Sequence, residues 1–268
     1  MHKVKPLVSV LFLTYKRVHL LKRTLESFTR NTDYPRLELV VADDGSSAPI
    51  QEQIRTMPFD KFVLAPENRG PGSNYNAGQR ACSGEYIFFL QDDWECRGPV
   101  GYLRDAVEAM QVNQKIGLVR FYGLDMGINP VHPIDREREI FEIQKPERVS
   151  GTNRHIYSDT PHLKSKALIH AIGEYNEKLP MDKCELEYQD RFLRQDGYCA
   201  AFFPRYMNRV FVHIGEAESF RTNSYHARLE RKLSALVTPL SQRAAPVYNL
   251  LRLWYLRIGR PFVRRLAK

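Results

Sequence analysis

The stretch Gly84-Glu85-Tyr86-Ile87-Phe88-Phe89-Leu90-Gln91-Asp92-Asp93 decides the fold class of this 268-residue chain. Its unbroken apolar run, residues 86–90, is typical of a strand that is buried on both faces of a parallel sheet. Two carboxylates follow at the point where this strand ends. Because ligands bind at the carboxyl ends of strands in open parallel sheets, Asp92 and Asp93 mark a candidate site.

The rest of the chain repeats this alternation of apolar runs and helical patterns. Apolar residues recur at three- and four-residue spacing over 20–28, which predicts a helix that ends near Asn31. This helix lies between apolar runs at 7–13 and 37–42, so the three form a right-handed βαβ unit. Further strands are expected at 61–64, 86–90, 117–122, 202–203 and 210–213, and further helices at 76–81, 100–112, 164–172 and 185–195. The turn-rich region 123–160 is expected to hold an irregular or hairpin insertion. The pattern predicts an α/β protein with a Rossmann-like, mostly parallel central sheet flanked by helices.

The composition is that of an ordinary globular protein, with 43% hydrophobic and 26% charged residues. The net charge of +9 by itself suggests a nucleic-acid or membrane partner. However, ten basic residues and one acid between Arg228 and Lys268 account for the whole excess. The body of the chain is therefore neutral, and nucleic acid is not expected to bind there.

The expected location is the cytoplasm. The four cysteines show no C-x-x-C spacing, which favours reduced side chains in packing roles over a disulfide or metal site. No apolar stretch reaches the ~20 residues that span a bilayer, and the first residues lack the apolar core of a signal peptide.

A second acidic pair, Asp43 and Asp44, follows the strand at 37–42. Either acidic pair alone is also compatible with a turn or a helix cap. A divalent cation that bridges a diphosphate needs hard oxygen ligands and an open side for phosphate, which Asp92 and Asp93 can provide. Asp43 or Asp44 can accept a hydrogen bond from a nucleotide base or a ribose hydroxyl, as acids after such strands do in dinucleotide sites.

Four segments resemble glycosyltransferase family 2 in their order and spacing. They are Val8-Ser9-Val10-Leu11-Phe12-Leu13-Thr14-Tyr15, Val40-Val41-Ala42-Asp43-Asp44-Gly45-Ser46-Ser47, Glu67-Asn68-Arg69-Gly70 with Asn76-Ala77-Gly78, and the stretch 84–93. The resemblance is strong over residues 5–125 and weak over 160–220. It implies an A-type glycosyltransferase (GT-A) fold, an inverting mechanism and a Mn²⁺ or Mg²⁺ cofactor.

The resemblance also implies which residues form the donor site. The nucleotide-sugar would be bound by Thr14, Tyr15, Arg17, Asp43, Asp44, Asn68, Gly70, Asn76 and Asp92. Asp92 and Asp93 would form the DxD motif, with Asp93 as the metal ligand. The chain departs from the family at two positions: Gln91 replaces the first acid of the D-D-D run, and Tyr75 replaces an Arg that commonly contacts phosphate or sugar.

The second half of the chain is expected to bind the acceptor. An inverting transfer needs a general base that deprotonates the acceptor hydroxyl. The segment Cys184-Glu185-Leu186-Glu187-Tyr188-Gln189-Asp190-Arg191-Phe192 resembles the family's E-D-x-D-L-x-x-R helix start and places Glu185 or Glu187 at the position of the base. The alternative is that these acids only favour a helix N-terminus.

Two further residues have both a functional and a structural interpretation. His213 resembles the late histidine that completes the metal shell of A-type enzymes, but a histidine after a strand is also compatible with a structural role. Trp94, beside the acidic pair, can stack on a sugar or pack in the core.

The basic tail forms a separate unit in this interpretation. Its apolar residues fall on one helical face: Val247, Leu250, Leu251, Trp254 and Ile258. This pattern predicts a basic amphipathic helix that contacts an anionic membrane surface, at the inner membrane face, or packs on the body or on a second subunit. The predicted division is a GT-A domain at 1–225, with a nucleotide-sugar-binding half at 1–122 and an acceptor-binding half at 123–225, and a tail at 226–268.

The sequence thus predicts a metal-dependent inverting glycosyltransferase. Its donor would be a UDP-, GDP- or dTDP-sugar, and its acceptor a hydroxyl of a glycan or lipid-linked molecule, as in polysaccharide biosynthesis. One alternative is a sugar nucleotidyltransferase, although Thr14-Tyr15-Lys16-Arg17 stands where those enzymes carry a glycine-rich loop. The other is a non-catalytic module that binds glycan or nucleic acid.

Overall fold

The computed structural model of the protein describes residues 5–123, 131–144 and 156–215. The strands in these ranges are β1 (Val8–Thr14), β2 (Leu37–Asp43), β3 (Lys61–Leu64), β4 (Tyr86–Gln91), β5 (Trp94–Cys96), β6 (Ile116–Arg120), β7 (Val131–Asp135), β8 (Ile140–Ile143), β9 (His162–Ser165), β10 (Cys199–Phe202) and β11 (Phe211–His213). The helices are α1 (Val18–Asn31), α2 (Ala48–Arg55), α3 (Pro71–Ala81), α4 (Tyr102–Val112), α5 (Lys166–Ile172) and α6 (Met181–Arg194).

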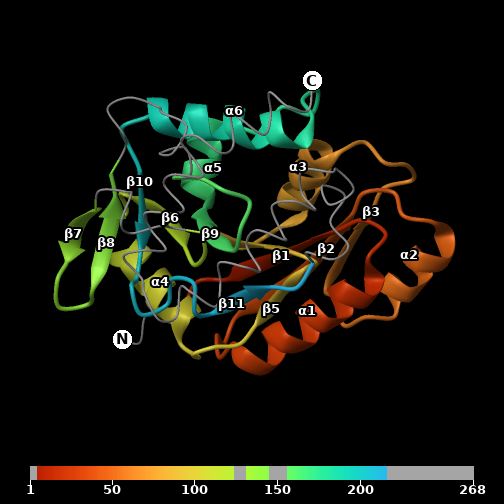
Figure 1. The fold of residues 1–268 in the computed structure, drawn as a ribbon, viewed down its shortest axis with the longest axis horizontal. Helices are drawn as coiled ribbons and strands as arrows, with labels where there is room; N and C mark the ends of the chain where they lie inside the picture. Colours follow the sequence, from red (N-terminus) through yellow and green to blue (C-terminus); the bar gives the residue numbers. More distant parts are fainter. Residues whose placement is uncertain (1–4, 124–130, 145–155, 216–268) are drawn as a thin grey trace, which may run out of the picture. The chain divides into compact units, whose positions relative to one another are not determined.

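Nine of the described strands form one sheet, in the order β3-β2-β1-β4-β9-β6-β10-β8-β7 (Figure 1). The first four strands of this order are parallel. β9 then runs antiparallel to both β4 and β6, and β10 runs parallel to β6 but antiparallel to β8. The predicted α/β fold is confirmed, with a parallel first half and a mixed second half.

The central strand β1 is buried along its whole length, as its apolar sequence requires. Its register places Thr14 beside Asp43 of β2 and Leu13 beside Gln91 of β4. The loops that follow these three strands therefore leave the sheet at the same edge.

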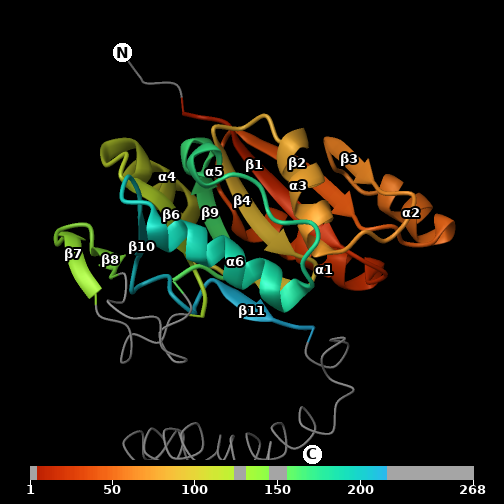
Figure 2. The ribbon, with the colours of Figure 1, turned by 90° about the horizontal axis from the view of Figure 1, so that it is seen from above.

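Two apolar layers cover the opposite faces of the sheet. α1 and α4 supply side chains such as Leu21, Phe28 and Leu103 to one layer. α3, α5 and α6 supply side chains such as Tyr75, Ile169 and Phe192 to the other layer. Figure 1 shows α5 and α6 on one side of the sheet and α1 on the other, and Figure 2 shows α5 and α6 side by side.

Three described elements were missed by the sequence analysis, namely α2, β5 and β9. The predicted helix at 164–172 was wrong at its start, because Lys164 and Ser165 belong to β9. α5 begins only at Lys166, since the Ser165 hydroxyl accepts a hydrogen bond from the backbone N–H of Leu168 at 3.1 Å and caps the helix. The expected insertion contains the β7–β8 hairpin.

The predicted tail at 226–268, and with it the membrane or subunit contact, lies outside the described residues and stays a prediction. Within the three described ranges, no helix combines the length and the apolar composition that crossing a bilayer requires.

A polar cluster around Glu38 connects the strands at the end of the sheet away from the acidic pairs. The Glu38 carboxylate accepts hydrogen bonds from the Ser9 hydroxyl and from the Ser83 N–H at 2.8 Å, and lies 2.7 Å from Lys61 Nζ. Burial alone would raise the pKa of Glu38, but the hydrogen bonds from Lys61 and Ser9 lower it to about 2.

We expect Glu38→Gln to destabilise the protein by about 2–3 kcal/mol at pH 7. A carboxylate with a lowered folded-state pKa stabilises the fold above its unfolded pKa, and this contribution is lost as the pH falls through its folded pKa. The difference between variant and wild type should therefore shrink between pH ~4.5 and pH ~2, measured by urea unfolding. Glu52→Gln, an exposed acid, is the control. A difference that does not change with pH would contradict the assignment.

Candidate active site

Arg17 bridges the two acids that follow β4. It lies in the loop after β1, beside the loop after β4, because the two strands are neighbours. Its guanidinium contacts the Asp92 carboxylate, and its Nη1 lies 2.8 Å from Asp93 Oδ2. Thr14 Oγ1 donates a second hydrogen bond to Asp92, at 2.7 Å. The structure thus brings Thr14, Arg17, Asp92 and Asp93 together in one connected cluster; their role in donor binding stays a prediction.

The two adjacent acids differ in their electrostatic environment. Burial raises the pKa of Asp92 to about 7, against the opposing charge of Arg17. Burial also disfavours ionised Asp93, but the hydrogen bond with His213 and the charge of Arg17 outweigh this and lower the pKa of Asp93. Asp93 is therefore the more firmly ionised of the pair.

The short β5–β11 ladder brings His213 to the acidic pair. His213 pairs with Trp94 across this ladder, and the Ile214 N–H donates to the Asp93 carbonyl at 2.8 Å. His213 Nε2 lies 3.3 Å from Asp93 Oδ2. Asp93 Oδ1 is buried and has no hydrogen-bond partner among the described residues. An ionised oxygen without a partner, next to an imidazole, fits the first ligands of a divalent cation.

The second acidic pair, Asp43 and Asp44, accepts hydrogen bonds from the loops around it. The Asp43 carboxylate accepts hydrogen bonds from the Ser46 N–H and hydroxyl and from Gln51 Nε2. Asp44 accepts from Asn68 Nδ2 at 2.9 Å, and from the backbone N–H groups of residues 69 and 70. The structure thus brings together three of the predicted nucleotide-binding residues, Asp44, Asn68 and Gly70. Their polar groups form hydrogen bonds with one another.

Gly45 allows these two loops to meet. It has a φ of +76°, and a Cβ at this position would lie 2.1 Å from the carbonyl carbon of Glu67. Only glycine fits both the left-handed backbone and the close approach of the 67–70 loop. The loop after β2 and the loop before α3 therefore pack directly against each other.

Asn76 holds the chain between α5 and α6 in place. Its Nδ2 donates to the Tyr175 carbonyl at 2.9 Å, and its Oδ1 accepts from the Tyr175 N–H at 2.9 Å. Its side chain is buried and also contacts Glu177. The structure does not bring Asn76 to the acidic cluster, because both of its polar atoms bond to this segment.

The two departures from the family pattern contact each other. Gln91 Nε2 donates to the Tyr75 hydroxyl at 3.0 Å. Tyr75 is buried and stacks on Tyr175 with ring centroids 4.6 Å apart. Beside Asp92 the chain thus has a neutral pair, Tyr75 and Gln91, where the family pattern has a charged arginine and an acid.

The two candidate bases are both half-buried and differ in their partners. Glu185 Oε1 accepts a hydrogen bond from the Asp159 N–H at 3.0 Å. Glu187 forms an ion pair with Arg191 one turn along α6, at 2.8 Å, with 35% of its side chain exposed. Asp159 was missed by the sequence analysis, since a single acid in a turn-rich segment carries no helical or strand signal.

Trp94 packs in the core. It is 4% exposed, with its ring 4.5 Å from that of Tyr122 and 4.9 Å from that of His213. In the described part of the chain, the indole N–H has no acceptor. A stacking role toward a sugar is therefore not favoured by its burial.

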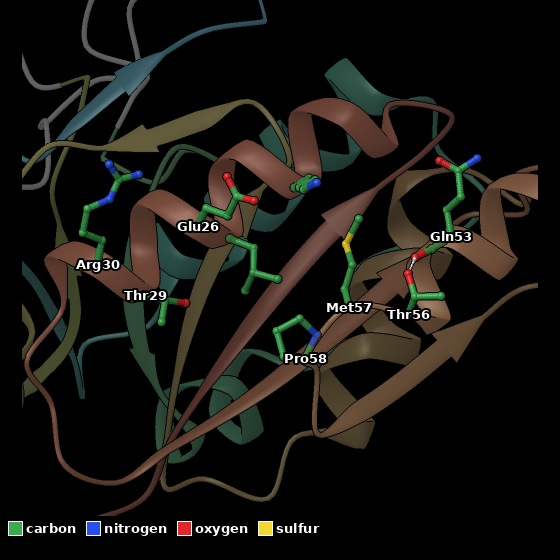
Figure 3. Close-up of a pocket in the computed structure, with 9 residues that line it drawn as sticks. Glu26, Thr29, Arg30, Gln53, Thr56, Met57 and Pro58 are labelled. Atoms are coloured by element: carbon green, nitrogen blue, oxygen red, sulfur yellow. Dashed lines mark hydrogen bonds between the residues drawn. The ribbon is translucent and has the colours of Figure 1, made fainter.

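A wide groove of about 780 Å³ lies away from these residues. Its lining comes from α1 on one side and from the end of α2 with Met57 and Pro58 on the other (Figure 3). None of the predicted site residues lines it.

Solved structures of low sequence identity share this architecture. The mannosyltransferase PcManGT from Pyrobaculum calidifontis, solved in complex with GDP-Man and Mn²⁺, is 19% identical and superposes with a TM-score of 0.57 over 97% of this chain and 72% of that chain. The fold is therefore that of the GT-A glycosyltransferases. The sequence model described as "Glycosyl transferase family 2" matches residues 9–173, and the chain belongs to this family.

Curated relatives match only in part. The Campylobacter jejuni GalNAc(5)-diNAcBac-PP-undecaprenol beta-1,3-glucosyltransferase is 34% identical over 95 residues, which cover 34% of this chain and 30% of that protein. The Streptococcus pneumoniae glycosyltransferase GlyA is 26% identical over 262 residues, which cover 91% of this chain and 35% of GlyA. The chain thus spans about a third of the length of these two relatives.

We expect Asn76→Ala to cost about 2–4 kcal/mol of stability, because it leaves both backbone polar groups of Tyr175 without partners. The affinity for a nucleoside diphosphate should stay within about threefold of wild type, since Asn76 does not face the acidic cluster. Asn74→Ala, which removes one contact to the Ala42 carbonyl at 3.1 Å, is the matched control for stability. Calorimetric unfolding and titration measure the two quantities. If the Asn76→Ala protein is stable but has lost affinity for the nucleotide, Asn76 is a donor-binding residue instead.

Proposed function

We propose that the chain transfers a sugar, with inversion, from a nucleotide-diphosphate-sugar to a hydroxyl of a glycan or lipid-linked acceptor. The observation that carries this proposal is Asp93, an ionised carboxylate with one unpartnered oxygen at the carboxyl edge of the sheet. PcManGT binds GDP-Man and Mn²⁺, and the Campylobacter relative is named for an undecaprenol-linked acceptor, so both supports agree with this class of reaction.

The donor site in this proposal is the cluster of Thr14, Arg17, Asp92 and Asp93. Asp93 and His213 would hold Mn²⁺ or Mg²⁺, which supplies positive charge to the leaving diphosphate. Within the described ranges, no three acidic, histidine or cysteine side chains gather into a complete metal cage, so diphosphate oxygens would complete the coordination shell. Arg17, which bridges the acids, would turn part of its guanidinium toward the anionic donor. Tyr15 and the Asp44 loop would line the nucleotide pocket.

The base in this proposal is Glu185. It would accept the proton of the acceptor hydroxyl, whose oxygen then attacks the anomeric carbon as the bond to the diphosphate breaks and the diphosphate keeps the electron pair. Glu185 is favoured over Glu187 because the Glu187 carboxylate is already paired with the charged Arg191 guanidinium.

A thermal-shift screen of UDP-, GDP- and dTDP-sugars with Mn²⁺ tests the donor site. We expect one donor to raise the Tm of the wild type by roughly 5 °C or more at saturation. Asp93→Asn should abolish the metal-dependent part of this shift and reduce donor turnover on the order of 100-fold or more. Asp190→Asn, which changes an exposed acid on α6, is the control. A wild-type protein whose Tm responds to none of these donors, with or without Mn²⁺, would refute the proposal.

A pair of variants on α6 tests the base. Glu185→Gln should lower the turnover of the donor found in the screen by about 100- to 10,000-fold with little change in donor affinity, because only proton transfer is lost. Glu187→Gln should keep turnover near the wild-type value and cost a few tenths of a kcal/mol, as expected for a half-exposed ion pair. If the two variants exchange these phenotypes, Glu187 is the base.

A further inference from the structure

Lys164 is a fully buried cation in the apolar layer beneath α6. It lies on β9, between β4 and β6, and has no exposed surface. Its Nζ lies 3.4 Å from the Tyr157 hydroxyl, 3.2 Å from that of Tyr175 and 3.4 Å from that of Tyr188. It also lies 3.9 Å from the centre of the Phe89 ring. Three hydroxyls and a ring face thus replace the water around this ammonium group.

The carboxylate that balances this charge is Asp159, which is reached through a tyrosine. The Tyr157 hydroxyl donates to Asp159 Oδ1 at 3.1 Å, so one hydroxyl separates the ammonium group from the carboxylate. Within the described residues, no acid lies within 4.0 Å of Lys164 Nζ. Asp159 itself is half-buried, whereas Lys164 is fully buried.

Burying the Lys164 ammonium group costs desolvation free energy, and packing alone does not explain why the residue is a lysine. A buried charge network is often no more stable than apolar side chains of the same volume. The tyrosine rings already stack closely, with centroids of Tyr175 and Tyr188 only 4.0 Å apart. A methionine at position 164 would fill the same space without the desolvation of an ammonium group.

The network reaches the candidate active site from two directions. The backbone N–H of Asp159 donates to Glu185 Oε1 at 3.0 Å, which fixes the carboxylate of the candidate base. Asp159 also interacts with the Tyr75 hydroxyl, which accepts from Gln91, the residue directly before Asp92. Asp159 therefore stands between the base and the end of β4.

We propose that Lys164 is a positioning residue: its buried charge holds Asp159 in place through Tyr157, and Asp159 in turn orients the Glu185 carboxylate relative to the acidic pair. This inference rests on the proposed function, in which Glu185 is the base. Without the cation, the Asp159 carboxylate would repel Glu185 and move away from the tyrosines, and its backbone N–H would no longer hold Glu185.

The electrostatics agree with this geometry. Burial and the charge of Glu185 together raise the pKa of Asp159 to about 7, against the opposing charge of Lys164. Burial lowers the pKa of Lys164 to about 7, and the charge of Asp159 opposes this. Each group thus favours the ionised form of the other.

Thermal unfolding of a double-mutant cycle tests the coupling between the two charges. The variants are Lys164→Met, Asp159→Asn and the double variant, with Lys183→Met, an exposed lysine at the start of α6, as control. We expect Asp159→Asn to lower the Tm of the wild type but to change that of Lys164→Met little, because the carboxylate has then already lost its counter-charge. Strictly additive shifts in Tm would overturn the coupling.

Turnover and donor affinity test the positioning role. We expect Lys164→Met to lower donor turnover on the order of 10- to 100-fold, through a misplaced base, with the Kd for the nucleoside diphosphate and Mn²⁺ within about twofold of wild type. Asp159→Asn should show the same split, and it decides the question if Lys164→Met does not fold. Lys183→Met should match the wild type in both quantities.

The outcomes separate this inference from the proposed function. Wild-type turnover in Lys164→Met and Asp159→Asn, or an equal loss of affinity and turnover in both, would overturn the positioning role while the glycosyltransferase proposal stands. An inactive wild type that binds no nucleotide-sugar would remove both.

Discussion

The parallel pairing of β1 with β2 on one side and β4 on the other determines where the site residues lie. With Thr14 beside Asp43 and Leu13 beside Gln91, each of the three strands ends at the same level. A shift of one residue in either pairing would move every side chain of the shifted strand to the other face of the sheet. It would also separate the Thr14–Arg17 loop from the acids after β4. The hydrophobic burial that fixes the register therefore also fixes the electrostatics of the site.

Charge balance is the second constraint on this edge of the sheet. Asp92 is fully buried and Asp93 nearly so, and two adjacent carboxylates in that environment repel each other. Arg17 offsets this repulsion from the loop after β1, and His213 on β11 contacts the same oxygen of Asp93 as Arg17 does. The two acids are thus balanced by basic side chains from both halves of the chain, Arg17 after β1 and His213 on β11.

The sequence was most informative where a signal was local. The apolar runs predicted β1, β2, β3 and β4, and four motifs in order predicted the family. The bridge from Arg17 to the acidic pair was not predicted. The sequence failed at β9, because four residues with a lysine and a histidine lack any strand pattern, and their pairing with β4 and β6 is a long-range contact. It also missed Asp159, and left Glu185 and Glu187 open, since a helix places the two on different sides and only long-range packing gives each its partners. The hydrogen bonds of Asn76 could not be predicted either, because its partner Tyr175 lies far along the chain.

The antiparallel strand β9 has a consequence for the modular engineering of this protein. It supplies the hydrogen bonds for one edge of β4 and one edge of β6, although it comes from a later part of the chain than both. A fragment that ends near residue 122 would leave those edges unpaired and the apolar surface around Phe89 uncovered, which favours aggregation. The predicted nucleotide-sugar-binding half is therefore not expected to fold stably when it is transferred alone. Chimaeras with other family members should exchange loops within the intact sheet and keep β9 with its own neighbours.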